Sequence, residues 1–321
     1  MSENGGLITF KPLVSLNKWG FDAKINNGFI YPPFYNNERV KTMRENWQTD
    51  EFDVFICTHQ KVGTHLAKKY LVEILRHTND YPVGSGMHSG DIGHHTVPWP
   101  EVMISQYGTD AFFNFIKKTS GKPRLWYLHN YFEDLPFKSV HPKSKFIHVF
   151  RDPRGVALSQ YHFYKNHPLL GVSKDINLDV FIDLFVDGKL YFGDYLKHTL
   201  NWAHKAPKLF GSASILNIRY EDMVEDKLNT ARKFIDFLGS AYKISENELL
   251  GIIAKTEYDK MKEEITVNPQ SFHLNPQSFF RQGKSYGWID ELSKNQIQKI
   301  ERRTQQIWGE NDPKLPYIHT N

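Results

Sequence analysis

The sequence predicts an α/β fold: a single domain with a central, mainly parallel β-sheet flanked by helices. Three observations support this fold class. Short apolar runs rich in β-branched residues alternate with segments whose apolar residues recur at helical spacing. The first of these runs is followed by a glycine-containing turn and then by a helix, which is a connection typical of phosphate-binding α/β proteins. No linker-like stretch divides the 321 residues, which favours one domain.

Four segments are expected to form the strands, namely residues 53–58, 124–129, 145–150 and 214–218. The sequences DVFICT and KFIHVF are nearly continuous apolar runs, as in strands that are buried on both faces. We therefore expect helices on both sides of the sheet.

The helices are expected where apolar residues recur every three or four positions, in residues 66–75, 155–164, 228–238 and 291–308. Gly239 is the expected C-terminal cap of the third helix. Residues 81–100 are rich in Gly, His, Ser and Pro, and residues 268–279 repeat Asn-Pro-Gln-Ser-Phe, so both are expected to be loops. Residues 1–50 are expected to be an irregular leader packed on the body, and residues 51–321 the domain itself.

Composition narrows the classes of function. The net charge of +4 is dispersed along the chain, which argues against a nucleic-acid-binding stripe. Cys57 is the single cysteine, so an intrachain disulfide is excluded. No segment approaches the roughly 18 apolar residues of a membrane span, and the first 20 residues do not resemble a signal peptide. We therefore expect a cytoplasmic protein without membrane or nucleic-acid partners.

The first candidate site is the turn at residues 58–65, with the sequence THQKVGTH. Gly63 permits close approach of the backbone, Lys61 supplies a positive charge, and Thr64 supplies a hydroxyl donor at a helix N-terminus. An ordinary strand-to-helix turn with a solvated lysine explains this motif alone equally well. The nucleotide-binding pattern G-x-x-x-x-G-K-[ST] is absent, which counts against an ordinary ATPase or kinase.

Two further motifs have the chemistry of phosphate sites. Arg151 follows a predicted strand, and Ser159 lies about two helical turns later, so the pair can bracket an anion. The loop with Arg281, Gln282 and Gly283 can hold phosphate through charge and backbone amides. Taken separately, each motif is explained more simply by a surface ion pair or a solvated turn.

The three motifs together, in this order and separation, resemble those of the cytosolic sulfotransferases. The longest match is RDPRGVALSQYHFYK at residues 151–165, and the resemblance covers roughly residues 53–288. It implies a P-loop-like sulfotransferase fold, 3′-phosphoadenosine 5′-phosphosulfate (PAPS) as donor, adenosine 3′,5′-bisphosphate (PAP) as product, and no metal. It also implies the donor-binding residues Lys61, Val62, Gly63, Thr64, His65, Leu66, Arg151, Ser159, Tyr220, Thr256, Tyr258, Arg281, Gln282 and Gly283.

The same resemblance suggests the acceptor side. His129 falls where the family has its catalytic histidine, before a matching Leu-Pro pair at residues 135–136. Pro98 and Trp99 match an acceptor-lining segment, and His88 is a weaker candidate nearby. We expect in-line transfer of a sulfuryl group to a small alcohol, phenol or amine. His129 would take the acceptor proton, and Lys61 would stabilise the leaving phosphate oxygen.

Two alternatives stay open at this point, a P-loop-type phosphotransferase and a non-catalytic nucleotide-binding protein. The first requires a lysine–hydroxyl motif and a carboxylate for Mg²⁺, and neither is clear in the sequence. The family's short C-terminal dimerisation motif is not evident, so a homodimer is neither indicated nor excluded.

Overall fold

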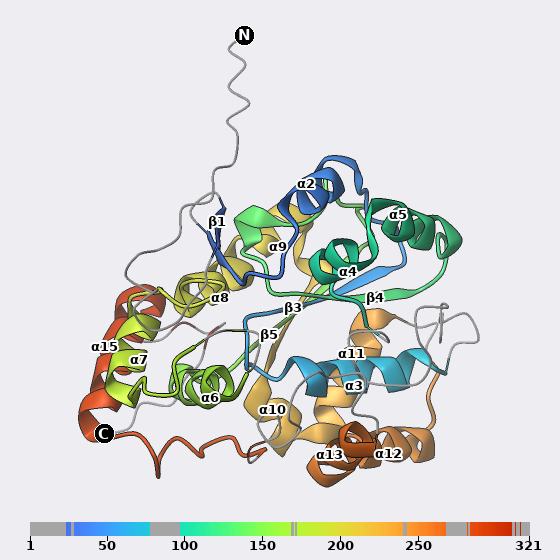
Figure 1. Cartoon of the computed structure of the whole chain (residues 1–321). Helices are drawn as coiled ribbons and strands as arrows, with labels where there is room; N and C mark the ends of the chain where they lie inside the picture. The colour runs from blue at the N-terminus through green and yellow to red at the C-terminus, as the bar shows by residue number, and fades with distance from the viewer. Residues whose placement is uncertain are drawn as a thin grey trace.

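The computed structural model of the protein describes residues 24–26, 29–77, 97–167, 170, 172–239, 243–267, 281, 283–309, 312 and 315, with the backbone alone at 24–26 and 265–267. Its centre is a four-stranded sheet in the order β4-β3-β5-β6, and every neighbouring pair is parallel. The strands are β3 (Asp53–Thr58), β4 (Arg124–Leu128), β5 (Lys145–Phe150) and β6 (Ile215–Arg219). The predicted parallel α/β sheet is therefore confirmed (Figure 1).

Helices cover both faces of this sheet. Val54 and Ile56 of β3 belong to the core shared with the helices below the sheet in Figure 1, whereas Phe55 and Cys57 belong to the core above it. This alternation follows from the two-residue period of a strand. The helices are α2 (Asn37–Asn46), α3 (Thr64–Leu75), α4 (Pro100–Tyr107), α5 (Thr109–Lys118), α6 (Pro153–Asn166), α7 (Leu178–Val186), α8 (Tyr195–His204), α9 (Ala206–Phe210), α10 (Tyr220–Glu225), α11 (Lys227–Leu238), α12 (Glu246–Lys255), α13 (Tyr258–Val267) and α15 (Lys294–Trp308).

Local sequence explains where two of the key helices begin and end. Helix α6 starts with Pro153, whose missing amide hydrogen costs nothing in a first turn, and the side chain of Asp152 caps the helix by accepting from the amide of Arg154 at 2.9 Å. Helix α11 ends at Leu238, and its C-terminal cap Gly239 has a φ of 113°. The predicted helices are confirmed, and their observed ends differ from the predicted ones by a few residues. For example, α6 starts at Pro153 and α15 at Lys294.

The leader differs from its prediction. Its described part is not irregular, because it forms the hairpin of β1 (Lys24–Asn26) and β2 (Phe29–Tyr31) and the helix α2. Asn36 caps α2, and Val40 and Met43 of that helix are buried. The end of the predicted loop 81–100 is one residue too late, since Pro100 begins α4, and residues 81–96 of that loop lie outside the described residues. Loop 268–279 lies outside the described residues, and the division of the chain at residue 50 stays a prediction.

The connections between strands explain where a ligand site can form. The chain leaves β3 toward β4 on one side, and after β4 it crosses β3 to enter β5 on the other side. In open α/β sheets, such a reversal of direction leaves a crevice at the carboxyl ends of the strands. The predicted donor loop at residues 59–63 lies at this end of β3.

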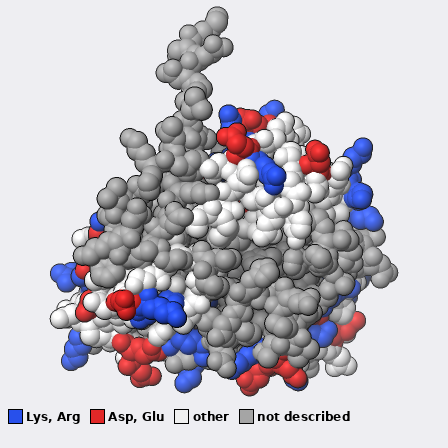
Figure 2. Space-filling view, in the orientation of Figure 1, with Lys and Arg blue, Asp and Glu red and all other residues white. Residues whose placement is uncertain are grey.

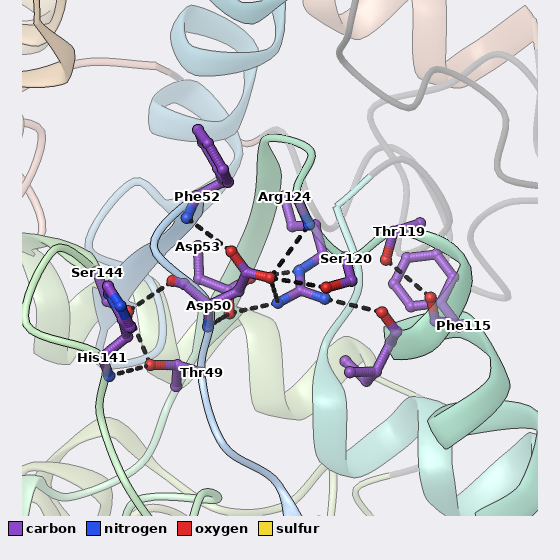
Figure 3. A network of polar contacts seen from close by, with 12 residues as sticks. Thr49, Asp50, Phe52, Asp53, Phe115, Thr119, Ser120, Arg124, His141 and Ser144 are labelled. Carbon is purple, nitrogen blue, oxygen red and sulfur yellow. Dashed lines mark hydrogen bonds and ion pairs between the residues drawn. The ribbon is translucent and has the colours of Figure 1, made fainter.

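The opposite end of the sheet is closed by a buried ion pair (Figure 3). Asp53 at the start of β3 accepts from Nε and Nη2 of Arg124 at 2.6 and 2.7 Å. It also accepts from the indole N–H of Trp126 at 2.8 Å and from the backbone amide of Asp50 at 2.6 Å. Because both partners are almost inaccessible to water, these bonds replace the lost hydration of the charges.

Candidate active site

The donor loop has the backbone geometry of an anion-binding turn. Gly63 has a φ of 103°, and a Cβ added there would lie 2.5 Å from Cδ2 of Tyr220, so a side chain would be strained and would clash. Lys61 also has a positive φ, 67°, which costs a non-glycine residue on the order of 1–3 kcal/mol. Helix α3 begins directly afterwards at Thr64, and its first amides lack partners within the helix.

Arg151 joins two of the motifs that are distant in the sequence. It follows β5, and its Nη1 donates to the backbone oxygen of Lys61 at 3.3 Å, while its Nη2 donates to that of Lys284 at 3.0 Å. Its guanidinium carbon lies 4.1 Å from the centre of the Tyr220 ring, a cation–π contact. The ring that excludes a side chain at Gly63 therefore also supports Arg151.

The third motif, the loop at Arg281 and Gly283, lies beside the cluster formed by Lys61, Arg151 and Tyr220. Gly283 has a φ of 65°, and a Cβ there would lie 2.3 Å from Cδ2 of Tyr258, the first residue of α13. Arg281 pairs with Glu291, and Glu291 accepts from Nε2 of His162 at 2.9 Å, which ties the loop to α6. Gln282 lies outside the described residues.

The electrostatics of this cluster suit an anion. Burial, together with the positive charges of Arg151 and Arg281, lowers the pKa of Lys61 to about 7. Among the described residues, Nε of Arg151 is buried without a hydrogen-bond partner. A buried donor of that kind costs free energy unless a ligand accepts a hydrogen bond from it. The residues present therefore fit a nucleotide with several negative charges, such as PAPS.

The other predicted donor residues lie around this cluster with fewer contacts. Thr256, the C-terminal cap of α12, is buried and donates to the backbone oxygen of Ile253 at 2.7 Å. Ser159 is half-buried on α6. Val62 is fully buried, which gives it a packing role, while His65 and Leu66 are half-buried at the start of α3.

His129 lies directly after β4 and is held by the end of β3. Its Nδ1 is 3.0 Å from the backbone oxygen of Thr58 and 3.0 Å from Oγ1 of the same residue. A carbonyl oxygen can only accept, so Nδ1 carries the hydrogen and Nε2 keeps a lone pair. Burial lowers the pKa of His129 to about 3, and nearby His59 and Lys68 add to this, so the ring is neutral at physiological pH.

Aromatic rings surround this imidazole. The ring centres of Trp99 and Phe192 lie 4.9 and 5.3 Å from that of His129. Tyr35 packs edge-on against Trp99 at 5.7 Å. Pro98, predicted for the same wall, accepts through its backbone oxygen from the amide of Tyr127 at 3.2 Å. The structure therefore brings three of the predicted acceptor residues together, whereas His88 lies outside the described residues.

Sequence reasoning missed three residues of this side. Phe192 has a φ of 63°, and Gly193 follows it, so an aromatic–glycine pair between predicted elements was the available signal. Tyr35 belongs to the leader, whose packing the local sequence does not reveal. Thr58 was recognised as the last residue of a strand, but its contact with His129 depends on the pairing of β3 with β4.

No group of three or more His, Cys, Asp or Glu residues within the described part of the chain is arranged to hold a metal ion. No helix there is long and apolar enough to cross a membrane. On the face shown in Figure 2, the described Lys and Arg side chains are interspersed with Asp and Glu. A cytoplasmic location stays a prediction.

Comparison with known proteins identifies the family. The family described as "Sulfotransferase domain" matches residues 51–312. The chain is similar to sulfotransferase 2A1 of Macaca fascicularis, at 26% identity over 87% of this chain and 92% of that protein. It is also similar to a 3-beta-hydroxysteroid sulfotransferase of Cavia porcellus, at 23% identity over 88% of this chain and 92% of that protein.

A solved structure shares the fold. The mouse sulfotransferase SULT7A1, complexed with PAP, superposes with a TM-score of 0.70 at 22% identity, covering 91% of this chain and 96% of that one. The family match also argues against both alternatives left open by the sequence, the phosphotransferase and the non-catalytic nucleotide-binding protein. The chain therefore belongs to the sulfotransferase family and is an enzyme that uses PAPS as its sulfuryl donor.

Proposed function

We propose that this enzyme transfers a sulfuryl group to the hydroxyl of a small, largely apolar acceptor, with His129 as general base. The observation that carries the proposal is the bond from Nδ1 of His129 to the backbone oxygen of Thr58, which leaves Nε2 free to accept a proton. PAPS, when bound, supplies a sulfuryl group that is activated by its linkage to a phosphate leaving group.

The donor residues act by charge and by shape. Lys61, Arg151 and Arg281 would hold the negative groups of the nucleotide, and Tyr220 and Tyr258 would support its body. As negative charge grows on the leaving oxygen, a lysine that is partly neutral in the free enzyme is stabilised in its charged form. This is the reason to assign Lys61 to that oxygen.

His129 would act as a base in spite of its low pKa. Because the ring is neutral at physiological pH, all of the enzyme carries the base in the form that can accept a proton. A negative donor group near the ring favours the imidazolium and raises the pKa toward the range in which proton transfer is efficient.

The acceptor class follows from the rings around the base. Trp99, Phe192 and Tyr35 are buried and present mostly carbon surface, which suits an apolar body carrying one reacting hydroxyl. The name of the Cavia porcellus relative indicates a hydroxysteroid acceptor for that protein, and this supports the same class here. Phenols and amines remain the alternatives to test.

The experiment compares the wild type with His129→Ala, using PAPS and a panel of small alcohols, phenols and amines, and detects the mass gain of one SO₃ group. We expect the variant to lose roughly 10²- to 10⁴-fold in turnover while it binds PAP with nearly unchanged affinity. His77→Ala, at an exposed histidine just after α3, is the matched control and should keep its activity. Full turnover in His129→Ala with intact PAP binding would rule out the general base.

A further inference from the structure

Thr58 is a buried polar residue to which the mechanism above gives no side-chain role. It is the last residue of β3, and its side chain is inaccessible to solvent. Its hydroxyl lies between two functional elements: Oγ1 is 3.0 Å from Nδ1 of His129 on one side and 3.0 Å from Oγ1 of Thr64 on the other. Thr64 opens α3, directly after the donor loop.

The hydrogens of this group can be counted. Oγ1 of Thr64 donates to Oγ1 of Thr58, and Oγ1 of Thr58 donates to the backbone oxygen of Leu128 at 3.3 Å. A hydroxyl has one hydrogen and two acceptor positions. The hydroxyl of Thr64 therefore cannot donate to Thr58 and to a bound anion at once, and a ligand that takes its hydrogen must change the bonding of Thr58.

The alternative arrangement forms a continuous chain. When Thr64 donates to an anion, the hydroxyl of Thr58 can turn from Leu128 to donate to Oγ1 of Thr64, because those two oxygens are already within hydrogen-bond distance. Oγ1 of Thr58 can then accept from Nδ1–H of His129. Consecutive hydrogen bonds of this kind polarise one another, and here the chain runs from the imidazole to the negative charge.

We propose that Thr58 is a positioning residue whose hydroxyl links His129 to Thr64, so that an anion bound at Thr64 stabilises positive charge on the imidazole. The proposal rests on the proposed roles of Thr64 and His129. It means that donor binding prepares the base to take the acceptor proton. By reciprocity, a protonated His129 strengthens donor binding by the same factor.

Other groups near the imidazole act in the opposite sense or are neutral. His59 and Lys68 oppose a positive charge on His129, and the phenol of Tyr127 packs 5.4 Å from its ring. His198 also interacts with His129 electrostatically. Because these basic groups oppose protonation of His129, the link through Thr58 would have to offset part of their effect, and this offset can be measured.

The test uses Thr58→Val, which removes the hydroxyl but keeps the branched shape, and Thr58→Ser, which restores a hydroxyl. The backbone oxygen of Thr58 remains in both, so the tautomer of His129 is retained. The first readout is the nitrogen NMR signal of Nδ1 of His129, recorded with and without PAP. The second is the separation of kcat from the KM for PAPS.

We expect PAP to shift the Nδ1 signal in the wild type and in Thr58→Ser but not in Thr58→Val. We also expect Thr58→Val to lower kcat about tenfold, with a change of less than about threefold in the KM for PAPS, and Thr58→Ser to recover most of it. A PAP-induced shift in Thr58→Val equal to that of the wild type would overturn the proposal. If instead His129→Ala keeps full turnover while the signal responds as expected, the general base fails and the link survives.

Discussion

The two ends of the central sheet differ in how far their buried charged groups are paired within the protein. At the amino ends of β3 and β4, every donor of Arg124 that faces Asp53 has an acceptor, and Trp126 adds a third bond to the same carboxylate. At the carboxyl ends, Arg151 keeps a buried nitrogen without a partner, and Lys61 adopts a left-handed conformation. The first end gains its stability from internal pairing, while the second retains unmet bonding capacity for a ligand.

Acid should affect the carboxyl end most strongly. His59 and His148 have pKa values lowered to about 4 by burial, and His129 to about 3. Because an unfolded histidine titrates near 6.5, the unfolded chain binds protons first as the pH falls from about 6.5 toward 4. Stability that is complete above that window is lost within it, by about 1.4 kcal/mol per pH unit for each titrating histidine.

Denaturant unfolding at a series of pH values measures this slope directly. His59→Gln should lower this slope by about 1.4 kcal/mol per pH unit, the contribution of one titrating histidine. A flat stability curve between these pH values would contradict the prediction.

The next largest effect is expected at the amino end. Asp53→Ala leaves Arg124 buried without its carboxylate and should cost about 3–5 kcal/mol in the free energy of unfolding. The folded fraction should still bind PAP with wild-type affinity, because the pair is remote from the donor loop. The double variant Asp53→Ala with Arg124→Met removes both charges and should recover much of the loss.

A matched control lies beside this pair. Glu51 and Lys143 form an ion pair on the surface of the same end of the sheet, and Glu51→Ala should hardly move the unfolding midpoint. An equal loss of stability in Asp53→Ala and Glu51→Ala would show that the burial of the pair has no consequence.

Changes at the donor side should affect binding more than stability. Arg151→Ala should weaken PAP binding by about 10- to 100-fold, the usual worth of one or two hydrogen bonds to a charged group. Arg219 ends the adjacent strand β6 but pairs with Asp222 at 2.9 Å, so Arg219→Ala serves as the control. Calorimetric titration with PAP distinguishes the two, and similar losses in both variants would contradict the role of Arg151.

The smallest expected effect is the uptake of a fraction of a proton when PAP binds. Since the pKa of Lys61 is lowered to about 7 in the free enzyme, much of this lysine is neutral at about pH 8, where phosphate groups are already deprotonated. A bound anion favours the charged form, so PAP binding should take up a fraction of a proton. Calorimetry in two buffers of different ionisation enthalpy measures the uptake. It should vanish in Lys61→Met and also in the wild type below about pH 6, where Lys61 is already charged.

The backbone geometry of the proposed donor side could be predicted from the sequence because its parts are local. Gly63, Arg151 and Gly283 each lie in a short motif whose backbone and charge requirements leave a recognisable pattern. The four strands could be predicted for the same reason, since a buried strand such as residues 53–58 is recognised from the apolar composition of its own short run.

The acceptor side could not be predicted to the same depth. Trp99, Phe192 and Tyr35 come from three separate segments, and only tertiary packing brings their rings together. The left-handed conformation of Phe192 is imposed by its surroundings and contradicts the preference of an aromatic residue. The bonds of Thr58 likewise depend on the alignment of β3 with β4, which a single sequence does not encode locally.

The turn at Phe192 has a consequence for how this enzyme can diversify. The amide of Phe192 donates to the backbone oxygen of Ile30, so a strand from the leader holds the residue that packs against His129. A Cβ at Gly193 would collide with the hydroxyl of Tyr131, which leaves this turn little freedom of its own. On the proposed acceptor side, variation in the leader would therefore change the rings that meet the acceptor without altering the loop at Lys61, and exchanging leaders between relatives would test this.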